Sequence, residues 1–234
     1  MFRIVTAYAK NSKLANIHPY EKAAFCIIPI LIIGFTRSIL MPAINILVFI
    51  ALHIISKNPL KLVLKFVLGI LGFALMSSVT FVFDYGIGYC LIVLLKCLSG
   101  GLAVTYLAFT TPIDDLLYVI SKNENLRDIC DIAKSMQRFL ILIEDEFFIL
   151  HSAVKARGGF DDFKSKVLNS GKVAGLLFIN TFRRWKEIKE AINSRCYRGH
   201  TCYFHKNFSS STKRRFAIFL YNLILLIICV YKEW

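Results

Sequence analysis

Two long apolar runs, separated by only two residues, restrict the possible fold of this chain more than any other feature. The run 66–83 (FVLGILGFALMSSVTFVF) and the run 86–109 (GIGYCLIVLLKCLSGGLAVTYLAF) lie on either side of Asp84 and Tyr85. Each run is close to the roughly 20 residues that a helix needs to cross a bilayer. Because so short a connection joins them, the sequence predicts a hairpin of two transmembrane helices.

Three further apolar runs extend this prediction to five spans. The runs 23–35 and 39–55 are shorter, each contains a proline, and only three residues separate them, so we interpret them as a second hairpin. The last run, 216–231, follows the basic pair Arg214 and Arg215. The predicted fold is therefore an all-α integral membrane protein, with about five transmembrane helices and a cytoplasmic section of amphipathic helices.

The composition agrees with a membrane protein that also has a polar part. Of the 234 residues, 56% are hydrophobic, although the formal net charge is +14. A soluble domain usually has about 45 to 50% apolar residues. Nucleic-acid binding would also explain a basic chain, but the apolar residues are concentrated in runs long enough to span a bilayer. We therefore expect membrane lipid as a partner and no nucleic acid.

The basic residues predict the orientation, because Lys and Arg near the ends of spans are retained on the cytoplasmic side. They gather before the first run and between the second and third runs, whereas the opposite loops offer only Arg37 and Asp84. The clustered residues are Arg3, Lys10, Lys13, Lys22, Lys57, Lys61 and Lys65. The N-terminus is thus predicted to lie inside, in a multi-pass protein of a prokaryotic cell (inner) membrane.

Four sections follow from this topology. Residues 1–22 form a cytoplasmic N-terminal segment, and residues 23–109 form the four-helix transmembrane section. Residues 110–213 return to the cytoplasm as a section of coupling helices, and residues 214–234 form the final span. The third section carries 17 Lys and Arg against 12 Asp and Glu, as expected of a soluble helical unit attached to a membrane.

Two amphipathic helices are predicted in this cytoplasmic section. Apolar side chains recur every three or four positions along 126–150, and a comparable pattern runs from about Val173 to Arg195. The residues between the two patterns are typical of turns and helix caps: Gly158, Gly159, Gly171, Asp161 and Asp162.

Each predicted helix ends beside an arginine. Arg157 and Arg195 are 38 residues apart, and we expect Gly158 or Gly159 to end the first helix so that Arg157 lies in its last turn. A guanidinium offers a planar fork of donors that suits a carboxylate on a partner protein. The alternative is that each arginine only interacts with the negative end of its own helix dipole.

Small residues flank both arginines and would let a second protein approach the backbone closely. These neighbours are Ala156 and Gly158 in the first stretch, and Ser194 and Cys196 in the second. The six residues, arginines included, are therefore the candidate partner-coupling site.

Six short motifs occur in a characteristic order along most of the chain. They are HPYEK (18–22), FTTPIDDLLYVI (109–120), QRFLILIEDE (137–146), KARGG (155–159), GLLFINTFRRWKEI (175–188) and AINSRCYRG (191–199). In order and spacing they resemble the transmembrane coupling subunit of energy-coupling-factor (ECF) transporters, the CbiQ/EcfT family. The similar family features are Pro-x-x-Lys, TTP-x-x-x-L, an aromatic-Arg-aromatic run ending in acidic residues, and two Ala-Arg-Gly motifs with their connecting helix.

The resemblance implies that the two arginine stretches end coupling helices that dock in grooves of a pair of ATP-binding-cassette (ABC) ATPases. It implies that this chain has no catalytic residue and holds no cofactor, because the ATPases bind and hydrolyse ATP. The chain would pass their motion to a substrate-binding membrane subunit, CbiM-like and with or without a small CbiN-like subunit.

The substrate is predicted from the last part of the chain. The stretch 175–199 is closer to the cobalt-type subunits, which implies cobalt uptake for cobalamin biosynthesis, with the metal captured by the partner. A shared EcfT subunit for vitamin or nickel uptake is the alternative. One departure from the family pattern is Ser194-Arg195-Cys196 in place of Ala-Arg-Gly, so the second helix cannot end at a glycine at 196, and Gly199 is the candidate for that role.

A metal site is the competing interpretation of the segment that follows the second arginine. Four potential ligands occur within ten residues, namely Cys196, His200, Cys202 and His205. Zinc accepts such ligands, but the spacing is tighter than in the usual paired-ligand loops. An ordinary loop is favoured, and no metal is assigned to the chain.

A membrane-embedded enzyme is the other alternative class. It would need clustered ionisable or nucleophilic residues at membrane depth. The polar residues of the spans are scattered and lack a carboxylate partner other than Asp84 in a loop; they are His53, Ser77, Ser78, Thr80, Lys96 and Ser99. The sequence contains no HExxH, no G-x-S-x-G and no P-loop. Catalysis by this chain is therefore not expected.

Overall fold

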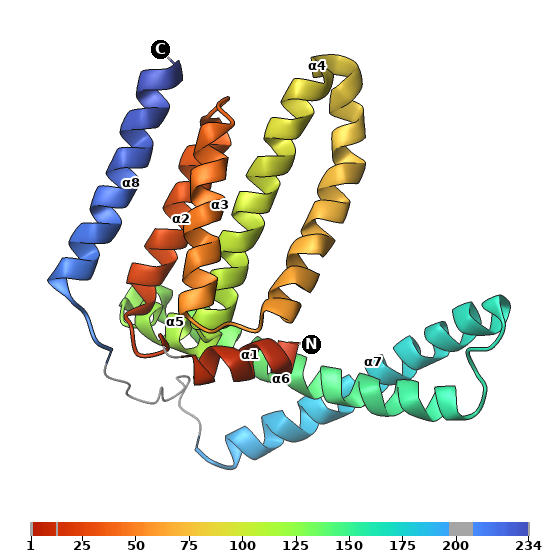
Figure 1. Ribbon diagram of the computed structural model, residues 1–234. Coiled ribbons are helices and arrows are strands. Elements are labelled where there is room, and N and C mark those ends of the chain that lie inside the picture. Colours follow the sequence, from red (N-terminus) through yellow and green to blue (C-terminus); the bar gives the residue numbers. More distant parts are fainter. Residues whose placement is uncertain (1, 13, 197–207, 234) are drawn as a thin grey trace. The chain divides into compact units, whose positions relative to one another are not determined.

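The computed structural model describes residues 2–12, 14–196 and 208–233. In these residues the regular structure is α-helical, apart from one isolated bridge between Ile17 and Ser209. The helices are α1 (Phe2–Asn11), α2 (Pro19–Phe35), α3 (Leu40–Ile55), α4 (Leu60–Thr110), α5 (Ile113–Ile120), α6 (Glu124–Ala156), α7 (Phe163–Asn193) and α8 (Thr212–Glu233) (Figure 1). The predicted all-α fold class is confirmed.

The chain forms two compact units. The first, called here the membrane unit, consists of Met1–Val119 together with His205–Trp234. The second, Ile120–Phe204, consists in its described part of α6 and α7 and is called the hairpin unit. The final helix of the chain thus returns to the unit that contains the first helices.

The two longest apolar runs form the predicted hairpin. The helix α4 contains a sharp bend at Gly86, whose φ of 81° and ψ of 171° are readily adopted only by glycine. The bend separates the arm Leu60–Phe83 from the arm Tyr85–Thr110. Both arms are long and apolar enough to cross a membrane, and so is Thr212–Tyr231 in α8.

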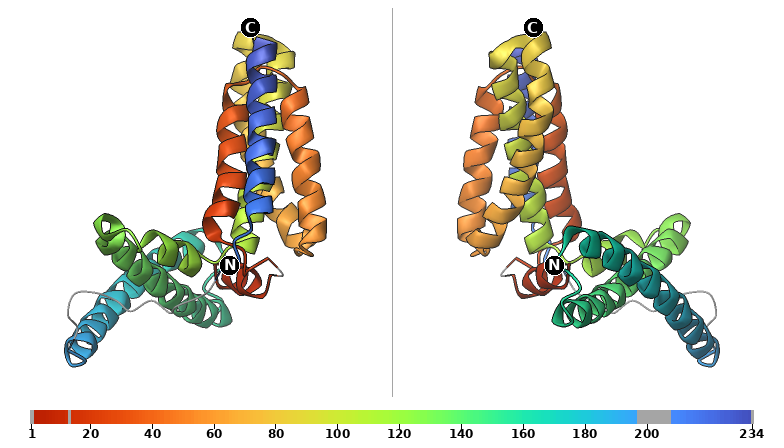
Figure 2. Two further views of the ribbon diagram at one scale, coloured as in Figure 1. Left: turned by 90° about the vertical axis from the view of Figure 1, so that its left-hand side faces the viewer. Right: turned by 90° about the vertical axis from the view of Figure 1, so that its right-hand side faces the viewer.

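Two shorter helices complete the membrane bundle. The helix α3 is apolar but has only 16 residues, about 24 Å at 1.5 Å per residue, against a hydrocarbon core of about 30 Å. The helix α2 has 17 residues, and its first turn contains the polar residues Glu21 and Lys22. Figures 1 and 2 show α2, α3, both arms of α4 and α8 side by side, with α1 across one end of the bundle.

The core of the membrane unit lies between α2, α3 and both arms of α4. Phe49 and Phe109 are almost completely buried there, and the ring of Phe49 meets the edge of Tyr106 at 5.8 Å. Several buried polar side chains of this unit are hydrogen-bonded, which offsets the cost of burying them. Asn45 donates to Ser99 Oγ at 2.6 Å and accepts from the Tyr221 hydroxyl at 2.7 Å, which joins α3, α4 and α8.

Another polar residue of the predicted spans, His53, also has a structural environment. Its Nε2 lies 3.2 Å from the carbonyl oxygen of Leu102, and its Nδ1 lies 3.0 Å from Asn58 Nδ2. One ring nitrogen therefore joins α3 to α4, and the other fixes the loop that follows α3.

The helix α1 was not expected from the sequence. This helix packs against α4, where the Tyr8 ring meets Phe109 at 6.3 Å. Lys10 in its last turn forms an ion pair of 3.1 Å with Asp114 at the start of α5. The contacts with α4 and α5 stabilise a helix too short to be stable alone.

In the hairpin unit, the beginning of α7 corrects the sequence prediction. The helix starts at Phe163, ten residues before the predicted Val173. Asp162 is the N-cap and accepts a hydrogen bond from the Lys164 amide at 3.2 Å. Gly171, predicted to be a turn residue, lies inside α7 with no other atom near the position of an added Cβ. A glycine facing open space costs about 1 kcal/mol and does not break a long helix.

Candidate functional site

The first arginine lies at the C-terminal end of α6, as predicted. Arg157 is the C-cap of the helix, and Gly158 after it adopts the left-handed conformation with a φ of 69°. The amides of Gly158 and Gly159 donate to the carbonyl oxygens of Lys155 and Val154 at 3.1 and 3.0 Å. These bonds satisfy the last carbonyls of α6, in the manner common at helix ends that finish on a glycine.

Both glycines after Arg157 are required by the local geometry. A Cβ on Gly158 would lie 2.8 Å from Asp161 Oδ2, in addition to the cost of the left-handed conformation. A Cβ on Gly159 would lie 2.5 Å from Val154 Cγ1. The turn after Arg157 is therefore tight, and it holds the end of α6 close to the start of α7.

Two contacts from outside the turn fix its shape. Asn169, in the second turn of α7, donates to the carbonyl oxygen of Gly159 at 2.7 Å. The ring of Phe160 stacks on His151 of α6, with centroids 4.8 Å apart. Arg157 is consequently presented, exposed to solvent, from a well-defined corner of the hairpin unit.

The second arginine lies just beyond the end of α7. The helix ends at Asn193 with Ser194 as C-cap, and the amides of Arg195 and Cys196 donate to the carbonyls of Ile192 and Asn193, each at 3.1 Å. Cys196 adopts a φ of 55°, which is uncommon for a residue with a side chain. The expectation that Gly199 would end this helix is wrong, because α7 ends before it; Gly199 itself lies outside the described residues.

The two arginine ends have the same local form. In each, the residue directly after the arginine takes the left-handed conformation, Gly158 at 69° and Cys196 at 55°. Both arginines are exposed, and among the described residues neither has an ion-pair partner. The neighbours Ala156, Gly158, Ser194 and Cys196 are exposed as well. The hairpin unit thus presents two guanidinium groups beside small, accessible residues.

One carboxylate, which was not among the predicted site residues, joins α6 to α7. Glu146 of α6 accepts from Asn180 Nδ2 at 2.9 Å and from Arg184 at 3.2 Å, one bond to each of its oxygens. The Glu146 side chain is 17% exposed, whereas Arg184 is 50% exposed. Both partners belong to the segment 175–188, so the acidic motif and the connecting helix of the sequence analysis meet here.

Beside Glu146 the two helices leave an apolar groove of about 440 Å³. Its walls are Met136, Phe139, Leu140 and Ile143 of α6 and Thr181, Phe182 and Trp185 of α7. Several large side chains of the same helices are more than half exposed, among them Ile129, Ile132 and Phe178. An exposed apolar groove with further exposed apolar side chains on the same helices is typical of an interaction site.

A buried thiol lies near the start of α6. Burial raises the pKa of Cys130 above its ordinary value, and the neighbouring Asp131 carboxylate raises it further. The thiol therefore stays protonated at neutral pH, and its chemistry is that of a small apolar packing residue.

In the membrane unit, two other motif segments meet. Lys22, near the start of α2, donates from Nζ to the carbonyl oxygen of Thr110 at 2.7 Å. Both residues are buried. Thr110 is the last residue of α4, so this bond lies where the chain leaves the membrane bundle toward α5.

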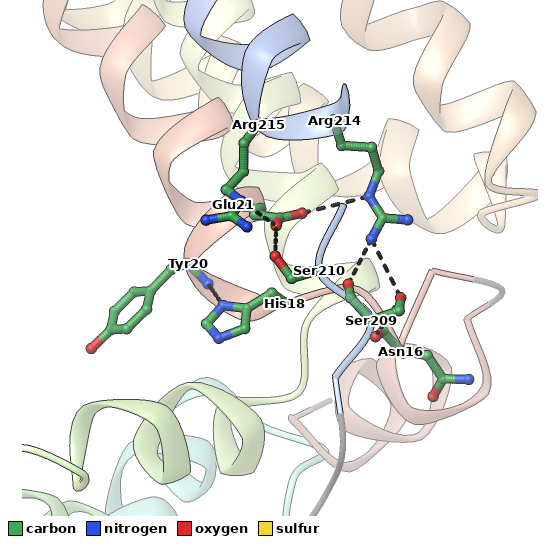
Figure 3. Close-up of polar contacts among 8 residues, drawn as sticks. All are labelled: Asn16, His18, Tyr20, Glu21, Ser209, Ser210, Arg214 and Arg215. Carbon is green, nitrogen blue, oxygen red and sulfur yellow. Dashed lines mark hydrogen bonds and ion pairs between the residues drawn. The ribbon is translucent and has the colours of Figure 1, made fainter. Parts of the chain in front are cut away.

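A second polar cluster joins the starts of α2 and α8 (Figure 3). The Glu21 carboxylate accepts from Ser210 Oγ at 2.7 Å and faces Arg214 Nε at 3.5 Å and Arg215 Nε at 3.7 Å. A terminal nitrogen of Arg214 also donates to the Ser209 carbonyl at 2.6 Å. The sequence contained a signal for this cluster, namely the acidic Glu21 at the start of α2 and the basic pair Arg214 and Arg215 at the start of α8.

Neither the predicted ordinary loop after Arg195 nor the alternative of a metal site there is tested by the described residues. Cys196 is described and exposed, but His200, Cys202 and His205 lie outside the described residues. Elsewhere, within the described ranges, no group of three or more His, Cys, Asp and Glu side chains is arranged to hold a metal ion.

Comparison with known proteins gives a consistent result. The model of the CbiQ family, described as cobalt transport protein, matches residues 10–204. An uncharacterized protein of Methanocaldococcus jannaschii, MJ1089, is 26% identical over an alignment of 246 residues. The alignment covers 96% of this chain and 92% of that protein. A putative fused cobalt transport protein, CbiMQ of Methanocorpusculum labreanum, is 30% identical over 108 residues, which cover 46% of this chain and 18% of that protein.

Proposed function

The chain belongs to the CbiQ family of cobalt transport proteins, and we propose that it is the transmembrane coupling subunit of an ABC-type ECF importer for cobalt. The observation that carries this proposal is the pair of matched helix ends in the hairpin unit. Arg157 and Arg195 each precede a left-handed residue, and each is exposed among small neighbours. The chain itself is non-catalytic in this proposal, binds no cofactor, and depends on two partner ATPases for ATP hydrolysis.

In this proposal each arginine docks on one ATPase. A guanidinium at a helix end can bind a partner carboxylate with two parallel hydrogen bonds, provided that the partner can approach closely. Gly158 has no side chain, and Ser194 and Cys196 have short ones, so the approach is open at both ends. Glu146 joins α6 to α7 through Asn180 and Arg184, which lets the two docked ends move as one body.

The apolar surface of the hairpin unit is proposed to contact the substrate-binding membrane subunit. The groove and the exposed apolar side chains beside it form a surface whose exposure to water is unfavourable. The name of the fused relative, CbiMQ, supports the association of a CbiM-like component with a chain of this family. Cobalt is then captured by that component and is the cargo of the complex, not a ligand of this chain.

The proposed topology places the N-terminus and residues 110–213 inside the cell and the C-terminus outside. The bond between Lys22 and Thr110 supports it, because the start of α2 and the end of α4 must lie at the same end of the bundle. The four proposed membrane crossings between these two residues, α2, α3 and the two arms of α4, return the chain to the side on which it started. The basic residues at this end agree with retention on the cytoplasmic side.

The test is cobalt uptake by cells that produce the complete transporter with variants of this chain. Replacing both Arg157 and Arg195 with Ala is expected to abolish uptake and to prevent copurification of the ATPases, while insertion into the membrane stays normal. Arg183→Ala is the matched control, because Arg183 is an exposed arginine of α7 away from the helix end. Normal uptake and normal copurification in the double variant would rule out the coupling role.

A further inference from the structure

The helices α2 and α8 enclose a groove in the membrane unit, distinct from the surfaces described so far. Its volume is about 450 Å³. The walls are mainly aliphatic, formed by α2 from Ala24 to Ile32 and by α8 from Ile218 to Leu226. The mouth is polar and consists of Tyr20, Glu21 and Arg215, the last two from the cluster of Figure 3.

The mouth carries an excess of positive charge. One carboxylate, Glu21, faces two guanidinium groups, Arg214 and Arg215, which leaves one positive charge over. Glu21 is 6% exposed, and its Oε1 accepts from Ser210, whereas its Oε2 faces Arg214 without a hydrogen bond among the described residues. The first turn of α8 contains no acidic residue.

The two arginines differ in what they can still bind. Arg214 is 39% exposed, and a terminal nitrogen of its side chain donates to Ser209. Arg215 is 63% exposed, and within the described residues its recorded contact is that of Nε with Glu21 at 3.7 Å. Its terminal nitrogens therefore remain available for a second acidic group, and their planar arrangement suits a phosphate.

The backbone adds to this preference for an anion. The helices α2 and α8 run side by side in the same direction, so their N-terminal ends lie together at the mouth (Figures 1 and 3). The positive ends of two helix dipoles thus lie at the same end of the groove as the terminal nitrogens of Arg215. Tyr20, 50% exposed at the same level, is a side chain typical of the membrane–water interface.

The length of the groove indicates what fills it. From Tyr20 to Ile32 the wall rises about 18 Å at 1.5 Å per residue, whereas one leaflet of the hydrocarbon core is about 15 Å, half of about 30 Å. A transmembrane helix of a partner would need a wall of the full thickness. A lipid needs one leaflet and a headgroup site at its end, which is the arrangement observed.

We infer that this groove binds one membrane lipid with an anionic phosphate headgroup, its chain between α2 and α8 and its phosphate on Arg215. Such a lipid would supply the second acid that the mouth lacks. It would also fill the gap between α8 and α2, and so hold the final helix of the chain against the bundle.

The inference is tested on the full-length chain, extracted in mild detergent and examined by native mass spectrometry after addition of equal amounts of phosphatidylglycerol and phosphatidylcholine. The wild type is expected to retain one phosphatidylglycerol in preference to phosphatidylcholine. Arg215→Gln should lower this retention about fivefold, the effect of one basic residue at a membrane surface. Lys213→Gln is the matched control, because Lys213 is an exposed neighbour that does not line the groove.

A second variant tests the groove itself. Ile28→Trp should fill the apolar part and lower the retention of both lipids, with an unchanged midpoint of thermal unfolding in the same detergent. Equal losses in Arg215→Gln and Lys213→Gln would show diffuse attraction only and would overturn the inference. A wild-type protein that retains no lipid would also overturn the inference. So would the loss of a membrane partner from the purified complex when Asn222→Leu is introduced, because that loss would assign the groove to a protein helix.

Discussion

Lys22 Nζ donates a hydrogen bond of 2.7 Å to the carbonyl oxygen of Thr110, and so connects the start of the first bundle helix with the end of α4. The two residues are 88 positions apart and both are buried. They belong to HPYEK and FTTPIDDLLYVI, two of the motifs on which the family resemblance rests. The structure thus gives a physical reason for the lysine of the first motif, which is hydrogen-bonded to the backbone where the second motif begins.

Replacing Lys22 with Met is expected to destabilise the membrane unit by about 1 to 3 kcal/mol, because the Thr110 carbonyl would lose a charge-assisted donor in a buried place. The measurement is the thermal unfolding midpoint in detergent. Lys65→Met is the control, since Lys65 is an exposed lysine at the start of α4. Equal midpoints for the two variants would show that the Lys22 bond contributes nothing to stability.

Adding a side chain after Arg157 and removing one after Arg195 should have opposite effects on stability. Gly158→Ala places a side chain at a φ of 69° and 2.8 Å from Asp161 Oδ2, so it should destabilise the hairpin unit by about 1 kcal/mol or more. Cys196→Gly removes a side chain from a φ of 55° and should stabilise by up to about 1 kcal/mol. Hydrogen exchange of the last amides of α6 and α7 measures both. Cys196→Ala, which retains a Cβ, should leave the exchange unchanged; an effect as large as that of glycine would show that the backbone conformation is not the cause.

The carboxylate of Glu146 should matter more for the union of α6 and α7 than an exposed ion pair would. Glu146→Ala removes both the bond to Asn180 and the bond to Arg184, whereas Glu146→Gln retains an oxygen that can accept from Asn180. We expect the alanine variant to lower the unfolding midpoint more than the glutamine variant. A double-mutant cycle with Arg184→Ala should give a coupling of about 0.2 to 1 kcal/mol, because Arg184 is half exposed. A coupling free energy of zero between Glu146 and Arg184 would mean that Asn180 alone connects Glu146 to α7.

Those parts of the fold that depend on local sequence could be predicted. The α4 hairpin follows from the length of two apolar runs, and the end of α6 follows from Gly158, because the left-handed conformation needs a glycine in most contexts. The helical path of residues 163–172 was missed because Gly171 was interpreted as a turn residue. In the structure this glycine faces open space, and Asp162 provides the cap that starts α7 eight residues earlier.

What the sequence could not supply was the pairing of distant residues. The segments that contain Lys22, Thr110, Glu146 and Arg184 were all recognised, but their contacts join positions 88 and 38 residues apart. Such contacts depend on how helices pack, which periodicity does not specify. The short helix α1 was missed for the same reason, since its stability comes from packing on α4 through residues such as Tyr8.

The left-handed Cys196 shows a different limit. The absence of glycine at this position suggested that the helix would continue toward Gly199, but α7 ends at Asn193 and Cys196 takes the unfavourable conformation. The cost, about 1 to 2 kcal/mol, is small beside the sum of contacts that hold α7 on α6. Local preference was outweighed by the rest of the hairpin unit.

The most direct measurement of the central claim is the Kd of the purified ATPase subunits for the full-length chain in lipid nanodiscs. Replacing Arg157 or Arg195 with Ala should weaken binding by about 2 to 5 kcal/mol, a rise in Kd of about 30-fold or more, because the partner carboxylate is left unpaired. Lysine at either position should restore only part of the affinity, because it lacks the planar fork. Arg183→Ala should leave the Kd unchanged. A double alanine variant that binds the ATPases with the wild-type Kd would contradict the account, and the two arginines would then be helix ends without a coupling role.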